Sequence, residues 1–160
     1  MKINKKRICI VLVGLLLILV GSRFLIFNVT PSLPRGMYLL LPAKDIQKGD
    51  LVIFDIPEHL KECQYIPKFT DILLKEVGAI ENDKVEIREE SLYINEKKYG
   101  NIYKQDSLGE KLPQLSQKQL QPLKGDFLPL APALNSYDGR YYGTVKITKI
   151  KNKAKLIIKI

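Results

Sequence analysis

ILLKEVGAIENDKVEIREESLYINEKK, residues 72–98, decides the fold that this sequence predicts. Short apolar runs alternate in it with polar turn sequences, and each run has the length of a β-strand. We expect strands at residues 72–79, 84–87 and 91–94, separated by the turn sequences Glu81-Asn82-Asp83 and Asn95-Glu96-Lys97. Sustained helical periodicity is nearly absent. The stretch is therefore typical of a mainly β protein.

The rest of the chain after residue 27 follows the same pattern. Further strands are predicted at Met37–Leu41, Leu51–Ile56, Asp126–Leu130, Gly143–Ile150 and Ala154–Ile160. Asn152 is the expected turn between the last two. Residues 104–124 are polar with spaced leucines, which predicts a loop with one short helix around Ser116–Leu120. Residues 28–160 are long enough for one modest domain.

Residues 8–27, ICIVLVGLLLILVGSRFLIF, form an apolar run with one charge, Arg23. Twenty residues of helix span roughly 30 Å, the thickness of the hydrocarbon core. A cleavable secretory signal is the alternative, but SRFLIFNV offers no small-residue cleavage site. We therefore predict a single transmembrane anchor at 8–27. The basic residues 1–7 would lie in the cytoplasm and residues 28–160 outside the membrane.

The net charge of +9 does not indicate a nucleic-acid-binding protein. Eleven of the 26 basic residues lie before Ile8 or after Asp138, and the chain between them is slightly acidic. This middle part has neither a nucleic-acid-binding motif nor a stripe of basic and aromatic residues. A single histidine, His59, and two distant cysteines, Cys9 and Cys63, predict neither a metal site nor a disulfide. No cofactor is expected.

A candidate nucleophile lies directly after the apolar run, in NVTPSLPRGMY, residues 28–38. Ser32 would need a base, and with one histidine in the chain a neutral lysine is the next candidate. Holding a lysine neutral at pH 7 costs roughly 4.6 kcal/mol, which burial reduces. Lys75 lies in the most apolar setting, in DILLKEVGAI, residues 71–80. The alternatives are that Lys75 points to solvent and that Ser32 is only a turn residue.

A third segment, NSYDGRYYG at residues 135–143, completes a pattern of three motifs. Together the three segments resemble the nucleophile, general-base and final motifs of the signal peptidase I family, which are membrane-anchored Ser/Lys endopeptidases. The first segment is most similar to the conjugation-associated TraF branch, with its Thr-Pro-Ser-x-Pro-x-Gly-x-Tyr run. The motifs occur in the expected order behind an anchor. The resemblance implies a signal-peptidase-like, β-rich catalytic domain after a single transmembrane helix, on the outer side of a bacterial cytoplasmic membrane.

The resemblance also assigns roles. Ser32 would be the nucleophile and Lys75 its general base. The hydroxyl of Thr30, two residues before the nucleophile, and the backbone N–H of Ser32 would form the oxyanion hole. Three residues of the last motif would support the site: Ser136, which orients the lysine, and the ion pair Asp138 and Arg140. Gly36 and Tyr38 would shape the turn. The alternative for the ion pair is a surface contact of little energetic value.

Some residues depart from the family pattern. Glu76 follows the lysine where arginine is usual, and its carboxylate would raise the pKa of Lys75 unless it points to the opposite face of the strand. Glu81-Asn82-Asp83 replaces Pro-Gly-Asp, and LPLAPALNS lacks the usual Gly-Asp-Asn or Gly-Glu-Asn lead. Gly139 stands where serine is commoner. These departures leave the Ser/Lys dyad intact.

The function that these residues predict is serine endopeptidase activity on exported precursor proteins. The branch resemblance narrows the expected substrate to a conjugative pilin precursor, with conjugation-apparatus proteins as partners. Either water or the precursor's own amine could resolve the acyl-enzyme. The alternatives are a general signal peptidase I and an inactive membrane-anchored assembly protein of the same fold.

A different class of function would rest on the C-terminal segment TVKITKIKNKAKLIIKI, residues 144–160. Lysines alternate there with β-branched residues, which predicts a hairpin with one lysine face. We interpret it first as a solvated edge protected by lysine. The alternative is a basic envelope-binding module that contacts anionic lipid headgroups.

Overall fold

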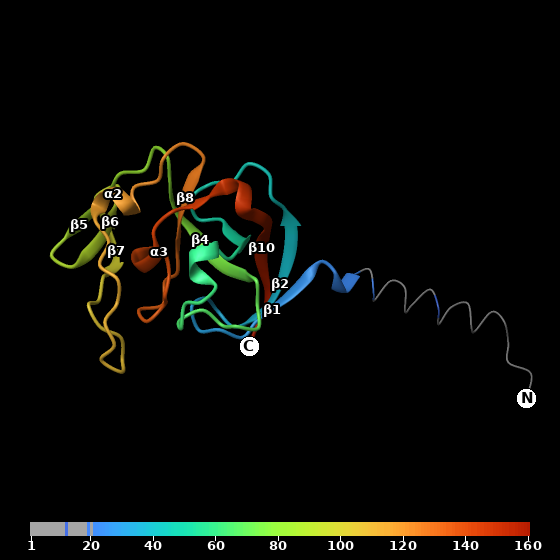
Figure 1. Cartoon of the computed structure of the whole chain (residues 1–160). Helices are drawn as coiled ribbons and strands as arrows, with labels where there is room; N and C mark the ends of the chain where they lie inside the picture. The colour runs from blue at the N-terminus through green and yellow to red at the C-terminus, as the bar shows by residue number, and fades with distance from the viewer. Residues whose placement is uncertain (1–11, 13–18, 20) are drawn as a thin grey trace, which may run out of the picture.

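A computed structural model describes Leu12, Leu19 and residues 21–160, and the strands of these residues form two antiparallel sheets (Figure 1). The larger sheet has seven strands, in the order β1 (Leu25–Asn28), β2 (Gly36–Pro42), β10 (Ile150–Lys159), β3 (Leu51–Asp55), β4 (Ile72–Ile80), β8 (Asp126–Leu130) and β9 (Val145–Lys146). The smaller sheet has the order β5 (Val85–Arg88), β6 (Ser91–Ile94) and β7 (Lys97–Asn101). The predicted mainly β fold is confirmed.

Four short helical turns connect the strands: η1 (Glu58–Leu60), α2 (Gln117–Leu120), α3 (Gly139–Tyr142) and η2 (Ile147–Lys149). The predicted helix around Ser116–Leu120 is confirmed as α2, with Ser116 as its N-cap. A capping box joins Ser116 to Gln119, whose side-chain oxygen accepts the backbone N–H of Ser116 at 3.0 Å.

The core follows from the alternation of side chains along the central strands. In β3, Val52 and Phe54 point to one face of the large sheet and Ile53 points to the other. The first face packs against Leu73 and Val77 of β4 and Phe127 of β8, whereas the second carries a smaller cluster around Tyr38 and Ala154. The smaller sheet packs its own apolar side chains against the end of β4 and against β8: Val85, Leu92 and Ile94 meet Ala79, Leu128 and Leu130.

Several boundaries differ from the prediction. Asn152 is not a turn, because Ile150–Lys159 is one strand that pairs with both β2 and β3. The interpretation of this segment as a hairpin at a sheet edge is therefore wrong. Residues 143–150 are not one strand, because Val145–Lys146 forms β9, η2 follows, and Ile150 already belongs to β10. Strands β1 and β7 were not predicted from the sequence.

Residues 1–11, 13–18 and 20 lie outside the described part of the chain. They include the whole predicted cytoplasmic segment, residues 1–7, and much of the predicted membrane anchor, residues 8–27. The last three residues of the predicted span, 25–27, belong to strand β1. Across residues 12, 19 and 21–160, no helix has the length and hydrophobicity that crossing a membrane requires.

The pairing of β4 leaves one part of it accessible. β4 pairs with β3 from Ile72 to Glu76, and with β8 only from Glu76 onward. Among the described strands, none pairs with the second edge of residues 72–74, and β1 likewise pairs only with β2. These two unpaired edges flank the candidate site.

Candidate active site

Lys75 lies on the buried face of β4, between Leu73 and Val77, and only 4% of its surface is exposed. Burial disfavours the charged ammonium and lowers the pKa of Lys75 from 10.5 to about 8. The negative charge of Asp138 opposes this shift and the positive charge of Arg140 adds to it. About one lysine in ten is thus neutral at pH 7. The alternative that Lys75 points to solvent is wrong.

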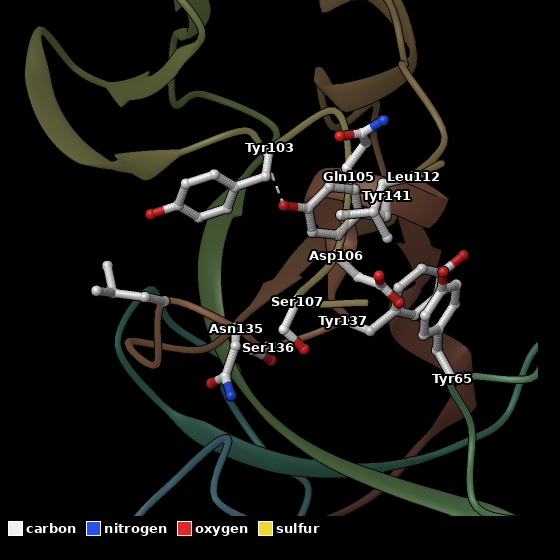
Figure 2. Close-up of a pocket in the computed structure, with 11 residues that line it drawn as sticks. Tyr65, Tyr103, Gln105, Asp106, Ser107, Leu112, Asn135, Ser136, Tyr137 and Tyr141 are labelled. Carbon is white, nitrogen blue, oxygen red and sulfur yellow. Dashed lines mark hydrogen bonds between the residues drawn. The ribbon is translucent and has the colours of Figure 1, made fainter. Parts of the chain in front are cut away.

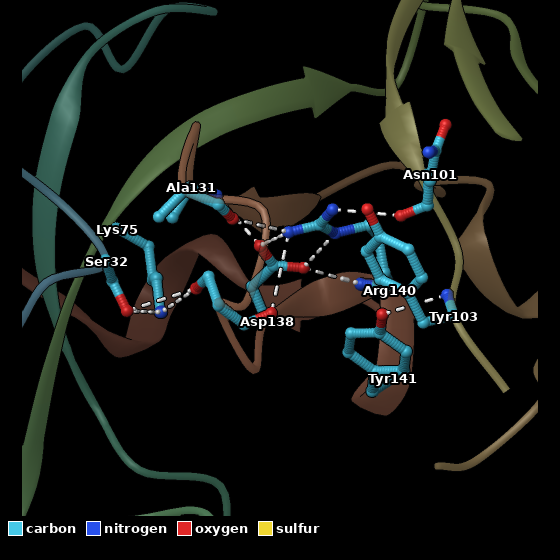
Figure 3. Close-up of polar contacts among 10 residues, drawn as sticks. Ser32, Lys75, Asn101, Tyr103, Ala131, Asp138, Arg140 and Tyr141 are labelled. Carbon is cyan, nitrogen blue, oxygen red and sulfur yellow. Dashed lines mark hydrogen bonds and ion pairs between the residues drawn. The ribbon is translucent and has the colours of Figure 1, made fainter. Parts of the chain in front are cut away.

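Two hydroxyl groups from distant segments meet at the end of the Lys75 side chain (Figure 3). The Lys75 Nζ donates to the Ser136 Oγ at 2.8 Å and to the Ser32 Oγ at 3.1 Å. The Ser136 Oγ in turn lies 3.1 Å from the Ser32 Oγ. The structure therefore brings together the nucleophile and base that the sequence predicts, with Ser136 in contact with both.

The loop that carries Ser32 is fixed from both ends. Leu33 inserts into the core, and the buried Tyr38 hydroxyl donates to the carbonyl of Pro34 at 2.7 Å. Gly36 begins β2 where the chain passes close to β10, and a Cβ there would clash with the carbonyl oxygen of Ile158. Ser32 is thus held on a short loop with little freedom to move away from Lys75.

Asn28 organises the same loop, and the sequence analysis did not identify it. Its Nδ2 donates to the carbonyls of Thr30, Leu33 and Pro34 at 3.1, 3.1 and 3.2 Å. Its Oδ1 accepts the backbone N–H of Thr30 at 3.1 Å and the Thr30 hydroxyl at 2.7 Å. The Thr30 hydroxyl has a single proton, so it must turn away from Asn28 before it can donate to another acceptor.

Asp138 and Arg140 form a buried ion pair, and the alternative of a weak surface contact is wrong. Arg140 Nε and Nη2 donate to the two Asp138 oxygens at 2.9 and 2.8 Å, with 2% and 0% of the two side chains exposed. Asp138 also caps α3 through the backbone N–H of Arg140 and accepts the N–H of Ala131. Arg140 Nη1 donates to the carbonyl of Asn101 in the smaller sheet. The pair therefore ties the final motif to β7 and to the chain after β8.

Two departures from the family pattern have structural reasons. Glu76 points to the face opposite Lys75, and it is not among the groups that shift the pKa of the lysine. A side chain at Gly139 would meet the carbonyl oxygen of Pro129 at 2.6 Å and the Leu128 Cδ1 at 2.7 Å. A serine side chain at this position would not fit without movement of β8.

A cleft of about 390 Å³ opens beside Ser32. The segment from Ile26 to Ser32 and residues 72–74 of β4 line it, so both unpaired strand edges border it. Its rim includes Phe27, Val29 and Phe69, which are 63%, 67% and 82% exposed. The cleft can therefore take an extended peptide, with apolar surface at its entrance.

In the described part of the chain, no group of three or more His, Cys, Asp and Glu side chains is arranged to hold a metal ion. The polar groups that meet beside the cleft are the hydroxyls of Ser32 and Ser136 and the buried amine of Lys75. Such a constellation is suited to acyl transfer, in which an amine activates a hydroxyl nucleophile.

The sequence matches the family model of signal peptidases, peptidase S26, over residues 5–159. This chain belongs to the signal peptidase S26 family. The family consists of serine endopeptidases that act on precursor proteins and are typically membrane-associated. The chain is also similar to a signal peptidase I of Enterococcus faecalis V583, at 21% identity and a TM-score of 0.42, over 72% of this chain and 98% of that one. These values are too low to add to the assignment, and no curated protein matches the chain.

The S26 peptidase has further polar contacts around the candidate site that the sequence analysis did not predict. Asn28 contacts Thr30, and Ala131 and Asn101 bind the ion pair through their backbones. Backbone groups leave no signal in a sequence. An asparagine two residues before a threonine is compatible with an Asx turn, which was the one available indication of the role of Asn28.

Proposed function

We propose that this S26 peptidase cleaves exported precursor proteins with Ser32 as nucleophile and Lys75 as general base. One observation carries the proposal: a buried lysine with a lowered pKa lies within hydrogen-bond distance of both Ser32 and Ser136. Neutral Lys75 accepts the Ser32 proton as the Oγ attacks the scissile carbonyl, and then passes the proton to the leaving amine. Water releases the acyl group by the reverse use of the same base.

The other polar residues take supporting roles in this proposal. The backbone N–H of Ser32 and the hydroxyl of Thr30 stabilise the oxyanion, once the hydroxyl has turned from Asn28. Asn28 Oδ1 keeps a partner during this turn, since it also accepts the backbone N–H of Thr30. Ser136 orients the Lys75 amine, and the ion pair of Asp138 and Arg140 holds Ser136 in position.

The surroundings of Ser32 favour a substrate delivered at a membrane. Exposed Phe27, Val29 and Phe69 surround the entrance of the cleft, and they suit a position close to the lipid headgroups. We place the N-terminus in the cytoplasm, the anchor within residues 8–27 and the catalytic domain on the outer face. The C-terminal lysines supply less free charge than the sequence indicated, because three of them form ion pairs: Lys146 with Asp126, Lys151 with Asp55 and Lys153 with Asp50.

The motif Thr-Pro-Ser-Leu-Pro-Arg-Gly-Met-Tyr supports a narrower substrate, a conjugative pilin precursor, with the conjugation apparatus as partner. In this version the precursor's own amine resolves the acyl-enzyme and closes a ring. A general signal peptidase I that releases linear products is the second candidate.

The test is the processing of precursors in cells that carry the wild-type chain, Ser32→Ala or Lys75→Ala. We expect both variants to accumulate unprocessed precursor. Mass spectrometry of the wild-type product then separates the two substrates, because a cyclic product is one water lighter than the linear product. Processing that continues in the Lys75→Ala variant would contradict the mechanism.

A further inference from the structure

A second cavity, of about 460 Å³, adjoins the catalytic groups on the side of Ser136. Its walls are unusually aromatic, with Tyr65, Tyr103, Tyr137 and Tyr141 together with Leu112. The lining residues come from the loop at residues 103–112, the segment at residues 134–141 and the separate position of Tyr65 (Figure 2). None of the steps proposed above uses this cavity.

The cavity is continuous with the catalytic site. It shares Tyr65, Asn135 and Tyr137 with the cleft beside Ser32. Ser32 lines only the cleft and Ser136 lines only the aromatic cavity, and the two hydroxyls are 3.1 Å apart. A peptide that crosses the reacting groups would therefore have one end in each hollow.

The chemistry decides which end enters which hollow. The acyl half carries the carbonyl that the Thr30 hydroxyl and Ser32 N–H stabilise, and the unpaired edges of β1 and β4 flank the cleft on that side. The amine half must receive the proton of Lys75, whose Nζ contacts Ser136 at 2.8 Å. The amine therefore leaves towards the hollow that Ser136 lines.

We propose that the aromatic cavity binds the segment of the precursor that follows the scissile bond and selects an aromatic or apolar side chain in its first three residues. The proposal rests on the proposed function and names a specificity site of the same reaction. The peptide bond between the two halves breaks, the acyl carbon bonds to the Ser32 Oγ, and the amine nitrogen takes the proton that Lys75 removed from Ser32.

The walls are rigid enough to discriminate between side chains. Tyr137 stacks on Tyr65 at 4.6 Å and on Tyr141 at 5.5 Å between ring centroids. The Tyr141 hydroxyl accepts the backbone N–H of Tyr103 at 3.1 Å, which fixes that ring against the loop. Stacked rings with fixed orientations favour a planar or branched apolar side chain over a flexible charged one.

The outer wall is a loop that folds on itself. Gln105 pairs with Lys111, and the Asp106 carboxylate accepts the backbone N–H groups of Leu108 and Glu110 at 2.8 and 2.9 Å. Ser107 faces the cavity, whereas Leu108 at the tip is 86% exposed. A tryptophan at position 107 would fill the cavity, and one at position 108 is its matched control.

The experiment compares Ser107→Trp, Leu108→Trp and wild type, as full chains in detergent, on two substrates with the same acyl half. One substrate is a precursor peptide with phenylalanine in the first three residues after the cut, and the other is the acyl-half methyl ester. We expect Ser107→Trp to lower kcat/KM for the peptide at least tenfold and to change the ester by less than twofold, with Leu108→Trp near wild type on both. Equal losses on both substrates, or no loss on the peptide, would overturn the proposal.

A binding measurement separates this proposal from the proposed function. Hexapeptides with a free amino terminus and phenylalanine at residue 1, 2 or 3 are titrated onto the Ser32→Ala chain, against an all-glycine peptide. We expect tighter binding of a phenylalanine peptide, weakened at least tenfold by adding Ser107→Trp. Absence of this preference would refute the cavity assignment even if cleavage occurs. If the preference is found but the wild type cleaves neither substrate, the proposed function fails and the binding site stands.

Discussion

Replacing Lys75 with methionine tests whether the fold disfavours the charged form of this lysine at the proposed catalytic centre. A pKa lowered from 10.5 to about 8 means that the folded state disfavours the ammonium by about 3 kcal/mol at pH 7, at 1.36 kcal/mol per unit. Methionine has a similar length and no charge, so it removes this penalty. It also removes the hydrogen bonds to Ser32 and Ser136, about 1 kcal/mol each, although these two hydroxyls still contact each other. We expect Lys75→Met to be inactive and about 1 kcal/mol more stable than wild type at pH 7.

The pH dependence of the stability difference separates the effect of the Lys75 charge from the effect of side-chain packing. The unfolded chain binds more protons at Lys75 than the folded chain between pH 8 and 10.5, so wild-type stability rises with pH across this window. The advantage of Lys75→Met should therefore shrink by about 2.5 kcal/mol between pH 7 and pH 10 and reverse its sign. Urea unfolding followed by far-UV circular dichroism measures the free energy of unfolding of Lys75→Met and wild type at each pH, with Lys124→Met as the exposed-lysine control. A difference for Lys75→Met that does not vary with pH would refute the reasoning.

Four further predictions follow from the same geometry. Below pH 8, kcat/KM should rise nearly tenfold per pH unit and then level off, because only neutral Lys75 serves as the base; a flat profile would contradict this. Asn28→Ala should lower kcat by about tenfold to a hundredfold, and it should have little further effect in a Thr30→Val background, if it acts through Thr30. Gly139→Ser should destabilise the domain by about 1–3 kcal/mol in urea unfolding, since the added atoms meet β8. Arg140→Met should destabilise the domain by about 3–5 kcal/mol, because the substitution leaves the buried Asp138 carboxylate without its ion-pair partner. A loss of stability under about 1 kcal/mol would contradict the burial of this ion pair.

The strands of the region 72–94 could be predicted from sequence because local signals agreed there. Apolar alternation, β-branched residues and polar turns all indicated the same boundaries, and the structure departs from them by one residue at most. The C-terminal strand was different. Asn152 favours turns locally, but strand partners on both sides bind its backbone, and this tertiary pairing outweighs the local preference.

The candidate site was predictable where side-chain chemistry is restrictive. The apolar setting of Lys75 left burial and solvent exposure both open, and the family resemblance favoured burial; the structure places Lys75 between Leu73 and Val77 on the buried face. The contacts of Asn28 and the aromatic cavity were not predictable, because each joins segments far apart in the chain. Tyr65 and Tyr137 stack across 72 positions, and neither occurs in a pattern that indicates a pocket.

Trapping the acyl-enzyme tests the central claim most directly. The full chain in detergent is mixed with a precursor peptide and quenched in acid, which protonates Lys75 and halts release of the acyl group. Digestion and mass spectrometry then locate the acyl fragment. The account predicts an ester on Ser32 that is absent from Ser32→Ala, and no adduct in Lys75→Met. A precursor cleaved at the wild-type rate by Ser32→Ala, or an acyl fragment on another residue, would contradict it.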